Sequence, residues 1–441
     1  MKKMLKQILL IIVSLLFCNL IFAANAEAEI YGRLAVQGVF NQNRLAVQKV
    51  FYTNGVVDGF SVQDGFSYFG LKGRNRIYKS SYLIWQIENF LNLSTGEPYA
   101  RTTGADFIAT RPAPGKKANA IGHPTSSVNT FASSDTFIGI NANWGMIRFG
   151  NLSNTFRTNT GAIDIFSGNG SAGYQNYDNV MNVLPGTVKY NSPTWGGFNF
   201  STFYNPNNIG GSFNNTLKDN TTFLNEGATN GYYGYGLYGG ALDYGISNLL
   251  LTYNFQVINN VGKYVRDGLG ITANNDFQIK PFNGWAQRLE AGWQDPTGMI
   301  LGVGAQITNG YNYSGWAGNF GASTIATSPQ FAKYKTANQI QTAETGLSLG
   351  WHIKKWTPKI SYISGTNIMA SQSNTFLNSM TGHNQIPGTW YQQVVTELDW
   401  SITPKTITFV GAGQIWWGEN AIDSGWQTNQ GTVTLGFSHV F

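Results

Sequence analysis

Apolar and polar residues alternate over short stretches along most of this chain. One stretch begins at residue 249, where the odd positions are apolar and the even positions between them are polar: Leu249, Leu251, Tyr253, Phe255 and Val257 against Thr252, Asn254 and Gln256. The end of the chain repeats the pattern, with Val433, Leu435 and Phe437 against Thr432, Thr434 and Gly436. Residues 82–91 follow it less cleanly. A period of two predicts β-strands with one apolar and one polar face.

The connections between these stretches alternate between short and long. Short connections lie at 143–145, 247–248, 295–298, 355–357 and 403–404. Long connections, rich in Asn, Gly, Ser and Thr, lie at 94–133, 206–235, 309–342 and 367–390. A membrane barrel has this asymmetry, with short periplasmic turns and long extracellular loops. Because lipid cannot satisfy backbone polar groups, strands cross it only as a closed sheet.

The number of alternating stretches predicts an all-β fold. We expect a transmembrane antiparallel β-barrel of about sixteen strands around an aqueous lumen, with both chain ends on the periplasmic side. A hairpin hidden in one long loop would make eighteen strands. The expected strands are 29–41, 65–74, 81–93, 134–143, 145–152, 186–192, 197–205, 236–246, 249–260, 284–294, 299–308, 343–354, 358–366, 391–401, 405–415 and 430–441.

The composition excludes several other classes of protein. Charged residues make up only 11% of the 441 residues, against about 25% in soluble domains, and aromatic residues reach 14%. So many aromatics among so few charges exclude disorder, and a single cysteine, Cys18, excludes a disulfide scaffold. The mean hydropathy of −0.18 argues against a helical membrane protein. The absence of a Lys/Arg stripe argues against nucleic-acid binding.

The first 26 residues have the features of a secretory signal peptide. Lys2, Lys3 and Lys6 precede an apolar core at 9–16, and Ala24-Asn25-Ala26 is a typical cleavage site. We therefore predict two parts, a signal peptide at 1–26 and a single barrel domain at 27–441. Removal of three lysines lowers the net charge from +6 to +3. A membrane anchor is the alternative, but the apolar stretch is short.

Five blocks of sequence resemble the strands of the Gram-negative general-diffusion porins. They are Ile30 to Leu34; Ser67 to Gly73 followed by Trp85 to Glu88; Phe137 to Ile140 followed by Trp144 to Gly150; Thr187 to Phe198; and Gly436 to Phe441. Each block by itself matches the family only approximately, whereas five matching blocks in the right order are a specific signal. Between about 206 and 429, only the rhythm of strands is similar.

This resemblance implies homotrimers of sixteen-stranded outer-membrane barrels, each with a pore narrowed by an inward-folded third loop. It implies passive diffusion of small hydrophilic solutes and ions, a surrounding of membrane lipid and lipopolysaccharide, and insertion by the barrel-insertion machinery. It implies neither enzymatic activity nor a cofactor. Two alternatives stay open: a solute-specific channel, which could have eighteen strands, and an adhesin or receptor role of the long loops.

Successive side chains of a strand point to opposite faces, and this alternation, which we call strand parity, predicts which charged residues face the pore. The neighbours of Arg33 face lipid, so Arg33 faces the lumen, and the same reasoning adds Lys72, Arg148 and Lys189 to this basic wall. Glu88 is the expected acidic wall residue. A charge on the lipid face costs about 2–4 kcal/mol at the midplane, which makes parity informative. Strand parity does not fix the height of a residue along the pore, so the alternative is that these charges only solvate the lumen and lie away from the constriction.

The third loop of the resemblance corresponds to roughly residues 152–185. It holds Arg157, Asp164 and Asp178 as candidate constriction residues. Pores of the resembled family set loop acids across from basic wall residues, and the resulting transverse field orders polar solutes. This loop is rich in Gly and Asn and poor in acids. Because the basic wall residues outnumber the acids, we predict a weak anion preference.

The end of the chain carries an expected assembly signal. Thr434, Gly436, His439 and Phe441 fit the pattern polar-x-Gly-x-x-aromatic-x-aromatic that marks outer-membrane barrels for insertion, with His439 as a loose aromatic. An ordinary amphipathic strand is the alternative interpretation.

Enzyme and metal motifs are weak or missing in the sequence. Residues 168–173 match G-x-G-x-x-G, but no βαβ unit surrounds them, so the match is attributed to chance. The four histidines are scattered without metal-ligand spacing, and no metal site is predicted. A Ser–His hydrolase assembled in space and a Ca²⁺ site on a loop stay open without support.

Overall fold

The computed structural model describes the strands of the chain and a few further residues. These residues are 26–44, 58–65, 67–91, 93, 132, 134–153, 155, 162–167, 183–205, 237–258, 284–309, 339–367, 369–371, 385, 387–418 and 429–441. Residues 1–25 of the predicted signal peptide therefore lie outside the described residues, and its last residue, Ala26, begins the first strand. Within the described part, no helix is both long and apolar enough to cross a membrane.

The described residues form eighteen β-segments. The first nine are β1 (Ala26–Arg44), β2 (Asp58–Asp64), β3 (Ser67–Tyr78), β4 (Ser81–Leu91), β5 (Thr136–Ala142), β6 (Gly145–Ser153), β7 (Val183–Asn191), β8 (Phe198–Asn205) and β9 (Leu237–Ile246). The others are β10 (Leu249–Ile258), β11 (Gly284–Gln294), β12 (Met299–Asn309), β13 (Gln339–Trp351), β14 (Trp356–Gly365), β15 (Met369–Ser371), β16 (Tyr391–Thr403), β17 (Thr406–Trp417) and β18 (Asn429–Val440).

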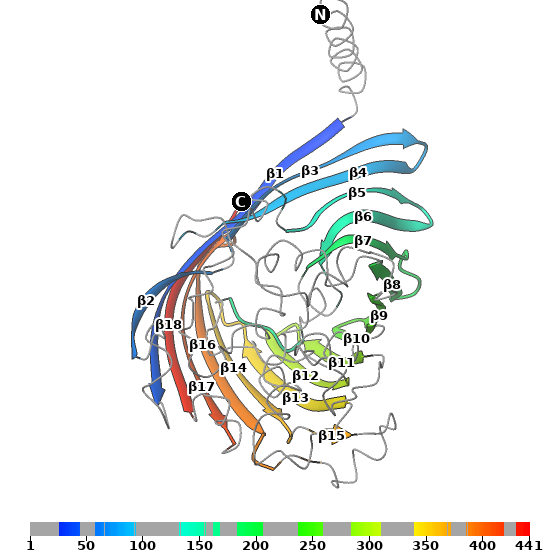
Figure 1. Cartoon of the computed structure of the whole chain (residues 1–441). Coiled ribbons are helices and arrows are strands. Elements are labelled where there is room, and N and C mark those ends of the chain that lie inside the picture. Colours follow the sequence, from blue (N-terminus) through cyan, green and yellow to red (C-terminus); the bar gives the residue numbers. More distant parts are fainter. Residues whose placement is uncertain are drawn as a thin grey trace, which may run out of the picture.

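The segments close into one antiparallel barrel in which each strand pairs with its neighbours in the sequence (Figure 1). Closure occurs between β1 and β18, where Arg33 lies opposite Val440 and Arg44 lies opposite Asn429. The amide and carbonyl of Gly32 also exchange hydrogen bonds with Phe441, at 3.2 and 3.1 Å. A closed sheet leaves no unpaired edge for lipid to meet, which is the condition for spanning a bilayer with strands.

The eighteen segments make sixteen barrel strands, because two strands are interrupted. β2 and β3 both pair with β1, one after the other, and the break between them falls at Gly65. β14 and β15 likewise both pair with β13. The predicted sixteen-stranded antiparallel barrel is therefore confirmed, and the eighteen-stranded alternative is wrong.

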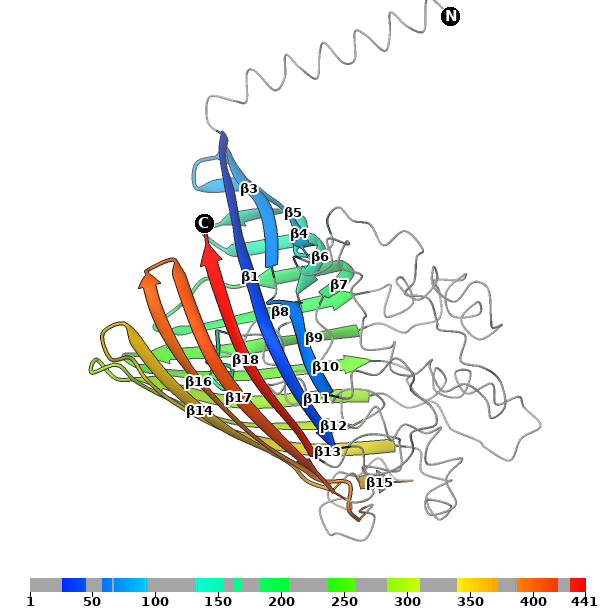
Figure 2. The same ribbon diagram turned by 90° about the vertical axis from the view of Figure 1, so that its left-hand side faces the viewer.

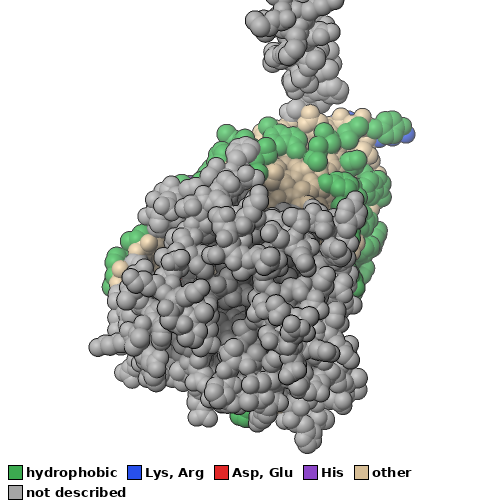
Figure 3. Space-filling view, viewed as in Figure 1, with side chains coloured by type: hydrophobic (Ala, Val, Ile, Leu, Met, Phe, Trp, Pro, Cys, Tyr) green, Lys and Arg blue, Asp and Glu red, His purple; other side chains and the backbone are tan. Residues whose placement is uncertain are grey.

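The two faces of the sheet differ as the alternation predicted. In β18, Val433, Leu435 and Phe437 are exposed on the outside, whereas Thr432, Thr434 and Ser438 are buried on the lumen side. The space-filling view shows hydrophobic side chains along the visible outer margin of the strands (Figure 3). Outward aromatic pairs stack near the strand ends, and the rings of Trp356 and Trp400 lie 5.7 Å apart. Such aromatic bands are typical of membrane interfaces.

The tilted strands do not all end at one level. Residues 26–31 of β1 continue past the level of Phe441 and pair there only with β3. At about 3.3 Å per residue, this extension measures roughly 20 Å. β1, β3 and β4 therefore project beyond the end of β18 (Figure 2). We assign this side to the periplasm, because it carries the chain ends and the short turns.

Most predicted strand boundaries agree with the structure to within three residues. The turn expected at 355–357 is shifted, because β14 already begins at Trp356 and the turn residues are 354 and 355. Lys354 there has a φ of 56°, the left-handed geometry that a tight two-residue hairpin requires. Segments β2 and β15 were not predicted: β2 lies between the expected strands 29–41 and 65–74, and β15 lies in the expected long loop 367–390.

Candidate functional site

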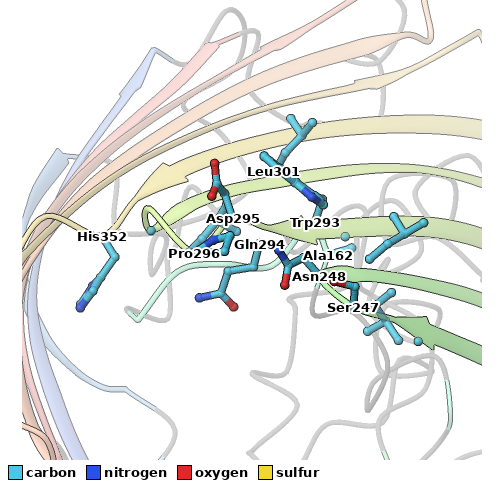
Figure 4. Close-up of a pocket in the computed structure, with 15 residues that line it drawn as sticks. Ala162, Ser247, Asn248, Trp293, Gln294, Asp295, Pro296, Leu301 and His352 are labelled. Carbon is cyan, nitrogen blue, oxygen red and sulfur yellow. The ribbon is translucent and has the colours of Figure 1, made fainter. Parts of the chain in front are cut away.

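A segment of the third loop lies against the inner wall of the barrel. The loop connects β6 to β7, and its described part is residues 162–167. This segment runs across the strands of the barrel beside the periplasmic turns rather than along them (Figure 4). Ala162 and Ile163 are buried against the wall, with exposed fractions of 8% and 0%. The third loop therefore folds inward, and the wall must offer it a matching surface.

Four glycines on the luminal face of β11, β12 and β13 provide this surface. They are Gly292, Gly302, Gly346 and Gly350. A Cβ atom at Gly302 would overlap the carbonyl oxygen of Ala162, and one at Gly346 would lie 3.1 Å from the Ile163 side chain. The Ser348 hydroxyl donates a 2.6 Å hydrogen bond to the Ile163 carbonyl. Missing side chains thus allow close backbone approach, a frequent reason for glycine inside a strand.

The far end of the segment is held by a buried ionic cluster. Lys359 Nζ lies 3.0 Å from Glu397 Oε1 and 2.6 Å from Asp399 Oδ2. It also donates a 3.0 Å hydrogen bond to Ser167 Oγ, and the Ser167 amide donates a 2.7 Å hydrogen bond to Glu397 Oε1. All three charged side chains are at most 6% exposed. We call Ser167, Lys359, Glu397 and Asp399 the loop clamp.

Arg33 joins the loop clamp from the other side. Its Nη2 donates a 2.6 Å hydrogen bond to the Ser167 carbonyl, and its Nε donates one of 2.9 Å to Ser438 Oγ. Arg33 therefore contacts the third loop directly instead of standing across an opening from it. Asp164 Oδ1 accepts a 3.4 Å bond from the Phe166 amide. Arg157, Asp178 and residues 168–173 lie outside the described residues.

Glu88 and Lys72 lie on the inner face at different levels. Glu88 accepts hydrogen bonds from the hydroxyl groups of Tyr31, at 2.8 Å, and Ser134, at 2.5 Å. Lys72 forms a 3.2 Å ion pair with Glu29 and lies 4.8 Å from the centre of the Tyr31 ring. Its side chain is 43% exposed, and its level on β3 falls within the periplasmic extension. Lys72 is therefore already paired and lies far from the loop clamp.

Arg148 and Lys189 lie directly opposite each other on β6 and β7. Arg148 Nη2 donates a 2.8 Å hydrogen bond to Asn191 Oδ1. Lys189 is 5% exposed, and its Nζ donates a 3.2 Å hydrogen bond to the Ser153 carbonyl. Among the described residues neither cation forms an ion pair, in contrast to Lys72, Arg288 and Lys359.

A row of polar side chains follows the wall from β11 to β16. Arg288 donates two hydrogen bonds to Gln306 Oε1, at 2.9 and 2.8 Å, and Gln306 Nε2 donates one of 2.9 Å to Glu344. The Tyr391 hydroxyl donates a 2.6 Å bond to the other oxygen of Glu344. These side chains are 0–1% exposed. The register makes Arg288, Gln306 and Glu344 direct cross-strand neighbours, and Tyr391 reaches Glu344 across Gly365 of β14. The row stiffens this half of the wall.

The exposure of luminal side chains is uneven around the barrel. From β10 to β16 they are largely buried, including Asn254, Glu290 and Thr308. On β3 to β6, by contrast, the luminal residues Tyr68, Gln86, Glu88, Phe137 and Arg148 are partly exposed. The solvent-accessible part of the lumen therefore lies along β3 to β6, opposite the wall that holds the third loop.

A pocket of about 710 Å³ opens at the periplasmic turns beneath the third loop. Its lining includes Ala162, Asn248, Gln294 and His352, which come from the loop, the turn between β9 and β10, the end of β11 and the residue after β13 (Figure 4). His352 Nδ1 shares a 2.8 Å hydrogen bond with Thr357. The described residues contain no group of His, Cys, Asp and Glu that could hold a metal ion.

The four residues of the expected assembly signal lie on both faces of β18. Thr434 is buried on the lumen side, and the ring of Phe409 lies over Gly436. His439 shares a 2.9 Å hydrogen bond with Thr406, and its ring stacks on that of Phe441 at 6.4 Å. The Phe441 ring contacts Gly32 and is 37% exposed on the outside.

Deletion of Phe441 should reduce the yield of folded barrel strongly. The last residue closes the sheet through two backbone hydrogen bonds to Gly32, so its loss opens the seam between β1 and β18. The measurement is the amount of heat-modifiable barrel in outer membranes. Phe441→Tyr, which keeps the ring and the backbone bonds, should assemble nearly normally. A normal yield from the deletion would contradict this role.

The loop clamp and the glycine surface were not predicted. Strand parity would have placed Lys359, Glu397 and Asp399 on the inner face, since they alternate with outward apolar residues such as Ile360 and Leu398. Their contact with Ser167 joins segments 192 to 232 residues apart, and no local pattern reveals it.

The comparisons with known proteins agree with this architecture. No family model matches the chain. The chain is 22% identical over 393 residues to the major outer membrane protein P.IA of Neisseria meningitidis serogroup C, covering 86% of this chain and 84% of that protein. It superposes on the anion-selective porin from Comamonas acidovorans with a TM-score of 0.57 at 13% identity, covering 95% of this chain and 100% of the other.

A second solved structure gives the same fold. Salmonella typhi OmpF, in a complex with daunomycin, matches with a TM-score of 0.53 at 14% identity, covering 94% of this chain and 97% of that chain. Together with the outer membrane relative, these structures confirm the resemblance that the five sequence blocks indicated. At these identities the solved structures establish the fold.

Proposed function

We propose that this chain, which has the fold of the general-diffusion porins, forms a passive, water-filled pore in the outer membrane for small hydrophilic solutes and ions. The pore works without a chemical step and without a cofactor, as a transport protein and not an enzyme. The barrel of residues 27–441 follows a cleavable signal peptide and assembles as a homotrimer in outer-membrane lipid and lipopolysaccharide. The barrel-insertion machinery recognises its last strand.

One observation carries this proposal: a closed barrel has a polar inner face that stays partly exposed along β3 to β6 while the third loop is held on the opposite wall. Sixteen strands enclose a space too wide to be filled by their own side chains. The segment 162–167, fixed to one wall, narrows this space from that side. We infer a permanent passage between this segment and the wall of β3 to β6.

Proteoliposome swelling tests this proposal. Liposomes that hold an impermeant polymer should swell in isotonic sugar when they contain the protein, because the sugar enters with water. The swelling rate should fall steadily as the sugar grows from a pentose to a trisaccharide. Empty liposomes and heat-denatured protein are the controls. A folded barrel that gives no swelling with any sugar would refute a diffusion pore.

The pore should prefer anions weakly. Lys72, Arg288 and Lys359 are each paired with acids, whereas Arg148 and Lys189 have no ion-pair partner among the described residues. Unpaired wall charges raise the local concentration of counter-ions in a narrow passage. The reversal potential in a tenfold KCl gradient should therefore have the sign of chloride selectivity.

The double variant Arg148→Gln, Lys189→Gln should move this reversal potential toward zero or to the cation side. Lys405→Gln is a matched control, since Lys405 lies in the turn before β17 on the periplasmic rim. A clear cation preference of the unaltered protein would contradict the prediction.

A further inference from the structure

We propose that Phe137, Arg148 and Lys189 form a binding site for aromatic carboxylates on the open side of the lumen. This inference rests on the proposed pore and specifies a solute class for it. The site lies on β5, β6 and β7, and its three residues face the lumen within a few residues of the periplasmic turn at 143–144. It is separate from the loop clamp on the opposite wall.

The first argument is a pair of adjacent positive charges that has no ion-pair partner among the described residues. Arg148 and Lys189 are direct cross-strand partners, a position in which like charges repel each other. Their hydrogen-bond acceptors are neutral, the side chain of Asn191 and the carbonyl of Ser153. Asp135 acts on both cations and Asp243 acts on Lys189 through space, but neither acid forms an ion pair with them, and Asp135 Oδ1 is occupied by the Ser153 amide. An anion from the lumen would relieve this repulsion.

The second argument is a free donor on Arg148. The Nε atom of Arg148 is buried and has no hydrogen-bond partner, while Nη2 is used by Asn191. A carboxylate binds a guanidinium through two parallel hydrogen bonds, a geometry that chloride cannot use. Nε itself is out of reach of a solute, so the carboxylate meets the terminal nitrogens, on the side of the residue that is partly exposed to the lumen. The site therefore favours a carboxylate over an inorganic halide.

The third argument is the flat apolar surface beside the cation. The guanidinium carbon of Arg148 lies 5.2 Å from the centre of the Phe137 ring, and that ring is partly exposed. Gly139 and Gly150 flank the ring on the luminal face, and a Cβ atom at Gly139 would lie 3.1 Å from the Arg148 side chain. On the β6 side, the wall next to Phe137 therefore carries few side chains, whereas Gln86 lies opposite Phe137 on β4. An aromatic ring can stack there while its carboxylate meets Arg148, and the buried Lys189 adds positive charge beside it.

Current block by benzoate in planar bilayers tests the site, with acetate and benzamide as probes that lack the ring or the charge. We expect benzoate to reduce the KCl current reversibly and saturably, acetate to act only at much higher concentration, and benzamide to have no effect. Equal block by benzoate and benzamide would overturn the proposal, because it would indicate apolar adsorption. A conducting pore that benzoate does not block would overturn it too, while leaving the diffusion pore intact. Absence of any conductance would instead overturn the proposed function.

Variants separate the site from unspecific effects. Arg148→Gln should weaken the benzoate block by at least about tenfold, since a charge-assisted hydrogen-bond pair is lost. Phe137→Leu should lower the benzoate affinity to that of acetate. Arg74→Gln is the matched control: Arg74 also lies over an aromatic ring, that of Tyr82, but it is exposed and paired with Glu27. Unchanged block in Arg148→Gln, or an equal loss in Arg74→Gln, would overturn the proposal.

Discussion

Gly302→Val should lower the single-channel conductance and the stability of the barrel together. Any Cβ atom at this position would overlap the carbonyl oxygen of Ala162, so the third-loop segment has to leave the wall. The only free direction is the lumen, and a loop displaced there narrows the passage. Overpacking of this kind costs about 1–3 kcal/mol of unfolding free energy.

The control for this variant is a glycine on the same surface that has room for a side-chain methyl group. A Cβ atom at Gly292 would lie 3.4 Å from the Ala162 side chain, an ordinary contact. Gly292→Ala should therefore conduct and unfold like the unaltered protein. The readouts are bilayer conductance and urea denaturation followed by tryptophan fluorescence. If Gly302→Val kept the original conductance, the third loop would not set the size of the pore.

Lys359→Met should destabilise the barrel by about 3–5 kcal/mol, because it leaves two buried carboxylates without a cation. Glu397 and Asp399 are 4% and 6% exposed in the loop clamp, so water cannot replace the lost charge. The Ser167 hydroxyl also loses its bond to Nζ. We expect greater current noise as the end of the segment loosens, in addition to the lower midpoint of denaturation.

The triple variant Lys359→Met, Glu397→Gln, Asp399→Asn provides the matched control. It removes all three charges and keeps amide groups that can bond to the Ser167 amide, so most of the lost stability should return. The current noise of the triple variant should be lower than that of Lys359→Met alone. Equal stability of the single and the triple variant would show that the buried ion pairs do not hold the loop.

The fold could be predicted from the sequence because its main determinant is local. Alternation along a strand such as β18 reports directly that one face meets lipid and the other meets the lumen. The errors lie where this signal is too short to be recognised. Segment β2 has only seven residues, in which Phe60 and Val62 alternate with Ser61 and Gln63, and β15 has only three residues, so neither stretch is long enough to identify a strand.

The functional site was less predictable because its contacts join distant parts of the chain. Strand parity predicts the face of the sheet on which Lys359 or Arg33 lies. It does not predict the height of the residue along the pore or the residue that it contacts. Ser167 meets Glu397 across 230 residues of sequence, a contact that only the closed barrel creates. Glycines such as Gly302 and Gly346 appear in the sequence as weak strand residues, and their purpose becomes visible only when the third loop lies on them.

Planar-bilayer conductance of the purified, unboiled protein tests the central claim most directly. An open passage between the third loop and the β3 to β6 wall predicts ohmic current that persists in the presence of glucose or sucrose, and the proposed homotrimer predicts current steps in groups of three. A correctly folded barrel, recognised by its heat-modifiable migration, that inserts into bilayers without any conductance would contradict a passive diffusion pore.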